Sequence, residues 1–140
     1  MRRSVIVTLL VTTTLVLTAV SIDAAPRPDG GPPVFTPVAK VHDLMALNQD
    51  FYKSLQTNLQ GGSPDWEKAG HEARLMAEIA NVLQYHHPPS EADWWRFAGA
   101  YGEGAKRLVE AAEAKKSTEA VGAHAALFSS CKQCHNKYRK

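Results

Sequence analysis

The chain has 140 residues, of which 16 are Lys or Arg and 14 are Asp or Glu, so its formal net charge at pH 7 is +2. This length is enough for one domain and no more. Because the sequence has no basic patch and no polybasic run, it predicts neither a nucleic-acid partner nor attachment to anionic lipid.

The first 25 residues have the pattern of a secretory signal peptide. Arg2 and Arg3 form a basic start, residues 5–20 are apolar except for threonines, and small residues at 21–25 suit cleavage. We therefore expect a periplasmic or otherwise exported protein, with an uncleaved N-terminal anchor as the alternative. No later apolar stretch is long enough to cross a bilayer, so no stable membrane span is expected after cleavage.

Residues 26–37 are rich in proline and glycine and are expected to form an extended tether. The domain proper, residues 38–140, places apolar residues at alternating spacings of three and four, which predicts helices. Four helices are expected, at about 36–59, 63–86, 90–116 and 117–140. The expected N-caps of the first three helices are Thr36, Ser63 and Ser90, and the fourth helix is expected to start at Ser117 or Thr118.

The connections between these helices are short, which makes neighbouring helices antiparallel. No alternating strand pattern interrupts them after the signal. The predicted fold is therefore all-α, an antiparallel up-down four-helix bundle.

The last helix carries the sequence C-x-x-C-H, formed by the chain's only cysteines, Cys131 and Cys134, and by His135. This is the attachment signature of c-type haem. The two thiols form thioether bonds with the porphyrin vinyl groups, and the His135 imidazole binds the iron as proximal ligand. On a helix the three residues occupy positions i, i+3 and i+4 and share one face. The motif predicts one covalent haem c on the C-terminal helix.

Other readings of the motif are weaker. A zinc site needs about four ligands, and the motif supplies three. A thioredoxin-like redox pair follows a strand, which is not predicted here. A disulfide within the motif would close almost no loop. A purely structural bundle, in which the cysteines have no redox role, remains a further alternative. Export favours haem, because c-type haem is attached outside the bacterial cytoplasm.

A haem motif at the end of a four-helix chain, followed by Tyr138 and Arg139, resembles the cytochrome c-prime family over roughly residues 38–140. The resemblance implies thioethers at both motif cysteines, the motif histidine as proximal ligand, and a distal residue at Met45. Family members with leucine or phenylalanine at the distal position bind nitric oxide or carbon monoxide, and those with methionine are low-spin electron carriers. The arginine that often precedes the distal residue by four positions is Val41 here.

Several side chains compete for the sixth position on the iron. Met45 lies within the apolar stripe of its helix and also suits core filling. His42, one turn earlier, would ligate if the register shifted, whereas His124 is expected in the core or the pocket wall. The remaining histidines are expected at the surface or in a loop: His71, His86 and His87.

Basic residues surround the haem motif: Lys132, Lys137, Arg139 and Lys140. They suit haem propionates, an acidic redox partner, or simply a solvated helix end. The resemblance also suggests a homodimer through the first two helices. The apolar flanks that are compatible with it are Leu44, Leu47, Phe51, Leu75, Ile79 and Val82.

We therefore expect an exported c-type cytochrome that transfers one electron at a time. The alternative is a five-coordinate haem protein that binds nitric oxide or another small gas. No nucleophile, general base or substrate cleft is recognisable in the sequence, so an enzyme is not predicted. The sequence does not indicate which protein is the redox partner.

Overall fold

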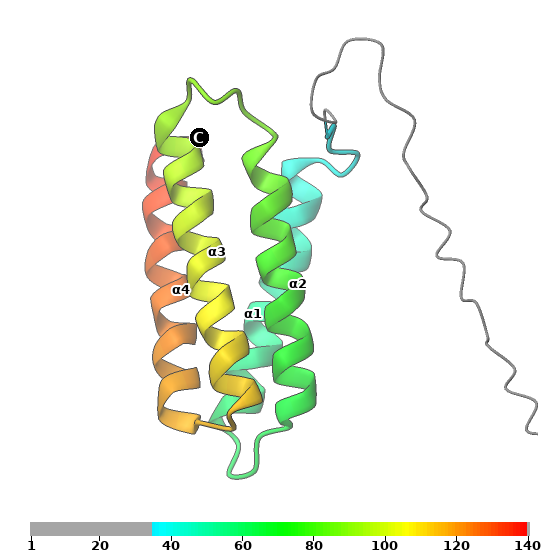
Figure 1. The fold of residues 1–140 in the computed structure, drawn as a ribbon, viewed down its shortest axis with the longest axis vertical. Helices are drawn as coiled ribbons and strands as arrows, with labels where there is room; N and C mark the ends of the chain where they lie inside the picture. The colour runs from blue at the N-terminus through cyan, green and yellow to red at the C-terminus, as the bar shows by residue number, and fades with distance from the viewer. Residues whose placement is uncertain (1–34, 140) are drawn as a thin grey trace, which may run out of the picture. The chain divides into compact units, whose positions relative to one another are not determined.

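The structure is a computed structural model that describes residues 35–139, which lie within one compact unit, Val34–Lys140. These residues form four α-helices and no strand. The helices are α1 (Val41–Gln60), α2 (Trp66–Gln84), α3 (Ala92–Glu113) and α4 (Ser117–Tyr138). They run alternately up and down (Figure 1), which confirms the predicted antiparallel four-helix bundle. The signal peptide expected at 1–25 and the tether as far as residue 34 lie outside the described residues and stay predictions.

The four helices do not pack equally against one another. The contact between α2 and α3 is the most extensive, followed by that between α3 and α4, whereas α1 meets α4 at few points. The start of α1, the α2–α3 connection and the end of α4 lie at one end of the bundle (Figure 1). No helix in the described part of the chain has the length and apolar character needed to cross a membrane.

The first helix begins later than the capping residues predicted. α1 starts at Val41 after Lys40, and not at Thr36 and Pro37. Val38 is 99% exposed, so a helical turn at this point would bury nothing. Forming a first turn costs free energy that burial must offset, and this segment offers no burial.

The second helix also begins later than expected, with Asp65 and not Ser63 as its N-cap. The Asp65 carboxylate accepts a hydrogen bond from the Lys68 backbone N–H at 3.0 Å. Asn58, in the last turn of α1, fixes Asp65 from the other side. Its Nδ2 donates to the Asp65 carbonyl at 2.8 Å, and its Oδ1 accepts from the Asp65 N–H at 2.8 Å. A contact between two helices therefore selects the cap.

The third helix begins at Ala92, with Glu91 at the N-cap position and no side-chain cap hydrogen bond, and Ser90 lies outside it. Asp93, in the first turn of α3, pairs with Arg96 at 3.0 Å and with Lys137 of α4. The fourth helix begins at Ser117, as predicted.

Small residues explain the close contact between α2 and α3. Ala73 and Ala80 of α2 and Ala105 of α3 are almost fully buried. A Cβ atom added at Gly102 would lie 3.1 Å from the Ala80 Cβ, so glycine permits this approach. The largest fully buried side chains surround the contact and form the main core: Leu55, Met76, Leu108 and Leu127.

We predict opposite effects for two glycine-to-alanine substitutions on helices. A Cβ at Gly104 of α3 would lie 2.9 Å from the Leu127 Cδ2, and Leu127 is fully buried. A Cβ at Gly122 of α4 would meet nothing within 4 Å. Gly122→Ala should therefore stabilise the fold by about 0.5–1 kcal/mol, because alanine is the better helix former. Overpacking in Gly104→Ala should lower the free energy of unfolding by about 1–3 kcal/mol, and the same gain in helix propensity should partly offset this loss.

Unfolding in urea, followed by circular dichroism, measures both effects. Gly122→Ala is the matched control, since it changes the same atoms without a clash. Equal stabilisation by the two substitutions would show that the α3–α4 contact is looser than the distance to Leu127 implies.

Candidate functional site

A cavity of about 800 Å³ opens along the seam between α1 and α4. α3 contributes aromatic and small side chains to its wall, among them Trp94, Phe97 and Ala98. All four residues predicted to bind or ligate haem line this one cavity: Cys131, Cys134 and His135 from α4, and Met45 from α1. Residues 86 positions apart in the sequence are thus brought to the same space.

The α4 wall carries the two thiols and the motif imidazole. Cys131, Cys134 and His135 are all half-buried, and both cysteines are free thiols. Burial raises the pKa of Cys131, with a smaller contribution from the neighbouring Cys134 thiolate. Burial also raises the pKa of Cys134. Both thiols are therefore held in the neutral form near pH 7, as apolar surroundings disfavour the thiolate.

On the α1 wall, Met45 is half-buried, whereas His42 is exposed to solvent. Met45 is half-buried and packs against the apolar cluster that includes Leu44 and Trp94. The His42 side chain is 92% exposed, and its Nδ1 lies 3.6 Å from the Asp43 carboxylate. His42 thus lies at the rim and faces solvent, whereas Met45 lies in the wall.

His124 is buried, and it joins α4 to α1. Its ring stacks on Tyr52 with a centroid distance of 4.1 Å and an interplanar angle of 19°. Its Nε2 lies 3.0 Å from the Tyr52 backbone carbonyl oxygen. Since a carbonyl can only accept, Nε2 carries the proton of this hydrogen bond. This contact gives His124 a structural role beside the cavity.

The remaining histidines do not line the cavity. His71 is exposed, and His86 and His87 lie in the α2–α3 connection, as expected. The His87 ring packs on Trp94 at a centroid distance of 4.2 Å and on Tyr138 at 5.9 Å, and Tyr138 packs on Trp94 at 5.2 Å. Trp94 and Tyr138 line the cavity, and His87 packs against both.

Sequence reasoning missed a polar pair in the cavity wall. The Tyr101 hydroxyl of α3 donates a hydrogen bond to the Asn48 Oδ1 of α1. Both residues line the cavity, and both are buried. Burial raises the pKa of Tyr101, so its hydroxyl stays protonated over the physiological range. An asparagine within an otherwise apolar helical stripe was the only signal in the sequence.

The charged side chains of the cavity are all basic. Lys53, Lys132 and Arg139 line it, and no Asp or Glu does. Lys137, from the same basic group of α4, instead pairs with Asp93 of α3, which lowers the pKa of Asp93 and raises that of Lys137. Lys140 lies outside the described residues. The cavity therefore combines apolar walls with a basic mouth.

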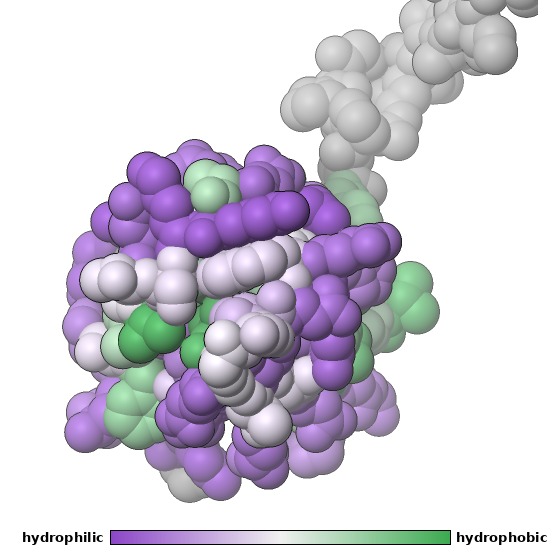
Figure 2. All heavy atoms as spheres, turned by 90° about the horizontal axis from the view of Figure 1, so that it is seen from below, coloured by the Kyte–Doolittle hydropathy of each residue, from purple (hydrophilic) through white to green (hydrophobic). Residues whose placement is uncertain are grey.

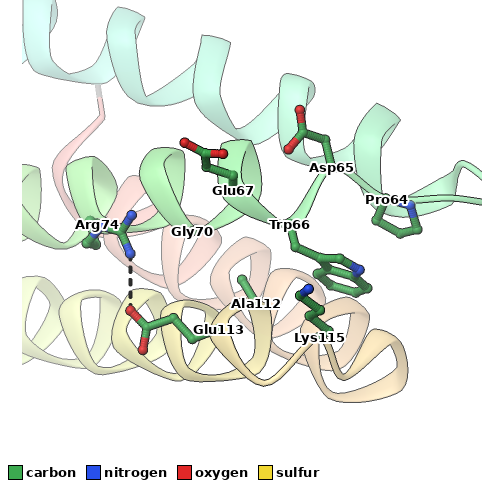
Figure 3. Close-up of a pocket in the computed structure, with 9 residues that line it drawn as sticks. All are labelled: Pro64, Asp65, Trp66, Glu67, Gly70, Arg74, Ala112, Glu113 and Lys115. Carbon is green, nitrogen blue, oxygen red and sulfur yellow. Dashed lines mark hydrogen bonds and ion pairs between the residues drawn. The ribbon is translucent and has the colours of Figure 1, made fainter.

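A second, more open depression of about 470 Å³ lies at the opposite end of the bundle (Figure 3). Its walls include Trp66, Lys115 and an ion pair between Arg74 and Glu113 at 3.1 Å. This end is mostly hydrophilic (Figure 2). None of the predicted site residues lies there. Across residues 35–139, no group of three or more His, Cys, Asp or Glu is arranged to hold a metal ion.

Comparison with solved structures gives the same fold. The chain superposes on cytochrome c′ from Thermochromatium tepidum with a TM-score of 0.62 and 22% identity, over 70% of this chain and 89% of that chain. A second cytochrome c′ is described as having an unusual ligand-controlled dimer dissociation. It superposes with a TM-score of 0.62 and 19% identity, over 70% of this chain and 89% of that chain. No family model and no curated protein matches the sequence. The chain thus has the four-helix fold of the cytochromes c′, as the resemblance predicted.

The pKa shifts of the two thiols predict slow alkylation of the folded chain in its haem-free form. Because thiolate is the reactive species, a raised pKa lowers the rate at any pH below it. The rate should approach that of the urea-unfolded chain as the pH rises through the folded pKa. Mass spectrometry of iodoacetamide adducts over pH 7–10 measures this. Equal rates in the folded and unfolded chains at pH 7.5 would contradict the burial of the thiols.

Proposed function

We propose that this chain is an exported c-type cytochrome, a carrier and not an enzyme, which holds one covalent haem in the α1–α4 cavity and transfers single electrons. One observation carries the proposal: the C-x-x-C-H residues of α4 and Met45 of α1 line the same cavity. The His135 imidazole and the Met45 thioether, which come from different helices, would be the two protein ligands that make the iron six-coordinate and low-spin.

The cavity fits a haem by volume, polarity and charge. About 800 Å³ lies within the usual range of roughly 300–1,000 Å³ for ligand pockets. Its walls are mainly apolar, as the macrocycle needs. Lys53, Lys132 and Arg139 supply cations without a competing carboxylate, which suits two propionates. Two free thiols and an imidazole on one helical face match the attachment chemistry.

Each residue then has a defined role. The Cys131 and Cys134 sulfurs would hold the porphyrin through thioether bonds, and the His135 imidazole would bind the iron. The Met45 sulfur would occupy the sixth position. Trp94, Phe97 and Tyr138 would exclude water. When bound, haem supplies a one-electron ferric–ferrous couple, whose potential a methionine–histidine pair raises.

The holoprotein should contain haem that resists extraction by acidified acetone, and it should show sharp low-spin bands that do not change with carbon monoxide. Met45→Ala should lose those bands and bind carbon monoxide, because the sixth position opens. Met76→Leu is the matched control, since Met76 is fully buried in α2 and does not line the cavity. Visible spectra of the oxidised, reduced and carbon-monoxide-treated protein decide the matter.

A high-spin spectrum that shifts with carbon monoxide in the unsubstituted protein would overturn the electron-transfer proposal. It would favour the alternative function, capture of nitric oxide or another small gas, with Met45 remaining in the wall as a core residue.

We also propose a homodimer through α1 and α2. Of the six flanking apolar residues, Leu44 and Ile79 belong to the core, and Phe51 and Val82 are half-buried. Leu47 and Leu75 remain 46% and 36% exposed. The structural neighbour whose dimer dissociates under ligand control supports an interface of this kind.

Glutamate at both Leu47 and Leu75 should convert a dimer to a monomer, since two charges would be desolvated in the interface. Val121→Glu on α4 is the control, because Val121 is equally exposed, at 46%, on a helix outside the proposed interface. Sedimentation equilibrium of the holoprotein measures the association. A dimer that survives the double substitution would place the interface elsewhere.

A further inference from the structure

The buried pair of Asn48 and Tyr101 is more specific than core packing requires. Asn48 is 7% exposed and Tyr101 is 6% exposed, and they come from helices 53 residues apart in the sequence. A buried amide costs free energy unless its polar atoms have partners. Among residues 35–139, only one of the two polar atoms of the Asn48 amide has a hydrogen-bond partner.

The free atom is the Asn48 amide nitrogen. Oδ1 accepts from the Tyr101 hydroxyl, and Nδ2 has no hydrogen-bond partner among the described residues. Among the described residues, three side-chain N or O atoms are fully buried and lack a hydrogen-bond partner: Glu72 Oε2, His86 Nε2 and Tyr138 Oη. Asn48 Nδ2 also lacks a partner but is not one of these fully buried atoms. Nδ2 therefore retains accessible surface. Because Asn48 is otherwise enclosed and lines the cavity, that surface opens onto the cavity.

Tyr101 fixes the orientation of this amide. The phenol has a single proton to donate, and burial raises its pKa, which keeps that proton in place. With Oδ1 turned toward α3, the two N–H groups face the other way. The pair thus presents an oriented hydrogen-bond donor in the α1 wall of the cavity.

We propose that Asn48 is a positioning residue for the sixth haem ligand: its Nδ2, which has no partner among the described residues, would donate a hydrogen bond to the Met45 sulfur once Met45 binds the iron. This inference rests on the proposed function. Met45 and Asn48 occupy positions i and i+3 of α1, so their side chains are neighbours on one face. A thioether sulfur is a weak acceptor, and outer-shell partners of this kind orient metal ligands and tune their basicity.

The hydrogen bond has a predictable electronic effect. It draws electron density from the sulfur and makes it a poorer donor to the more electron-demanding ferric iron. The ferrous state is then relatively favoured, which raises the reduction potential. Loss of the donor should shift the balance toward the ferric state.

The test is a redox titration of the holoprotein and its variants. Asn48→Leu should shift the ferric-to-ferrous ratio at a fixed potential by roughly two- to tenfold toward ferric, which is the range of a typical net hydrogen bond. Tyr101→Phe removes only a hydroxyl, keeps the ring packing, and should give a smaller shift in the same direction. Asn81→Leu, at an exposed asparagine of α2, is the matched control and should leave the ratio unchanged.

The decisive comparison repeats Asn48→Leu and Tyr101→Phe in a Met45→Ala background. If Nδ2 acts on the Met45 sulfur, both shifts should vanish there. Shifts that persist would mean that Asn48 acts only through cavity polarity, and the proposal would be wrong. Absence of any shift in the presence of Met45 would overturn it equally. Should Asn48→Leu fail to fold, Tyr101→Phe decides alone.

The test separates this proposal from the proposed function. Loss of acid-acetone-resistant haem or of low-spin bands in the unsubstituted protein would refute the function itself. If the unsubstituted protein retains both, and the ferric-to-ferrous ratios of Asn48→Leu and Tyr101→Phe equal that of Asn81→Leu, only the role of Asn48 would be refuted.

Discussion

The stack of His124 on Tyr52 joins α1 to α4, and the cavity depends on how these two helices are aligned. The two helices run in opposite directions and meet at few other points. Met45 lies seven residues before Tyr52, and Cys131 lies seven residues after His124. At 1.5 Å per residue, both are about 10 Å from the stack, toward the same end of the bundle. Met45 and Cys131 are therefore level with one another along the cavity, and a shift of α1 by one turn would separate them.

The four helices pack unevenly, and this leaves the space between α1 and α4 that forms the cavity. Alanine and glycine at the α2–α3 contact bring those helices close together, and a single added methyl group at Gly102 would meet Ala80. Along α1 and α4 the facing residues are larger, half-buried side chains such as Met45, Tyr52 and Cys131. Tight packing on one side supplies stability, and the opposite seam remains open for a planar group. Protein interiors are otherwise close-packed, so a cavity of this size indicates a binding site.

The sequence could predict whatever depends on local pattern. Helix number, antiparallel order and the shared face of Cys131, Cys134 and His135 follow from periodicity and spacing, and the structure has them. The helix starts were wrong where a neighbouring helix decides, as when Asn58 of α1 binds Asp65 and displaces the cap from Ser63. The pairing of Asn48 with Tyr101 needs the register of α1 against α3, which no local pattern contains. Met45 was singled out only through the family resemblance, because a methionine in an apolar stripe is ordinarily core.

Helix geometry also divides the basic residues near the motif into two roles. Lys132 of α4 and Arg139, which directly follows the helix in an extended conformation, both line the cavity. Lys137 is five residues from Lys132, which rotates it by about 140° toward α3, where Asp93 neutralises it. The positive charge at the mouth therefore comes from side chains without a carboxylate partner among the lining residues. A mouth of this kind attracts anionic groups from within the cavity and from outside it, so the same lysine and arginine suit haem propionates and the acidic surface of an electron-transfer partner.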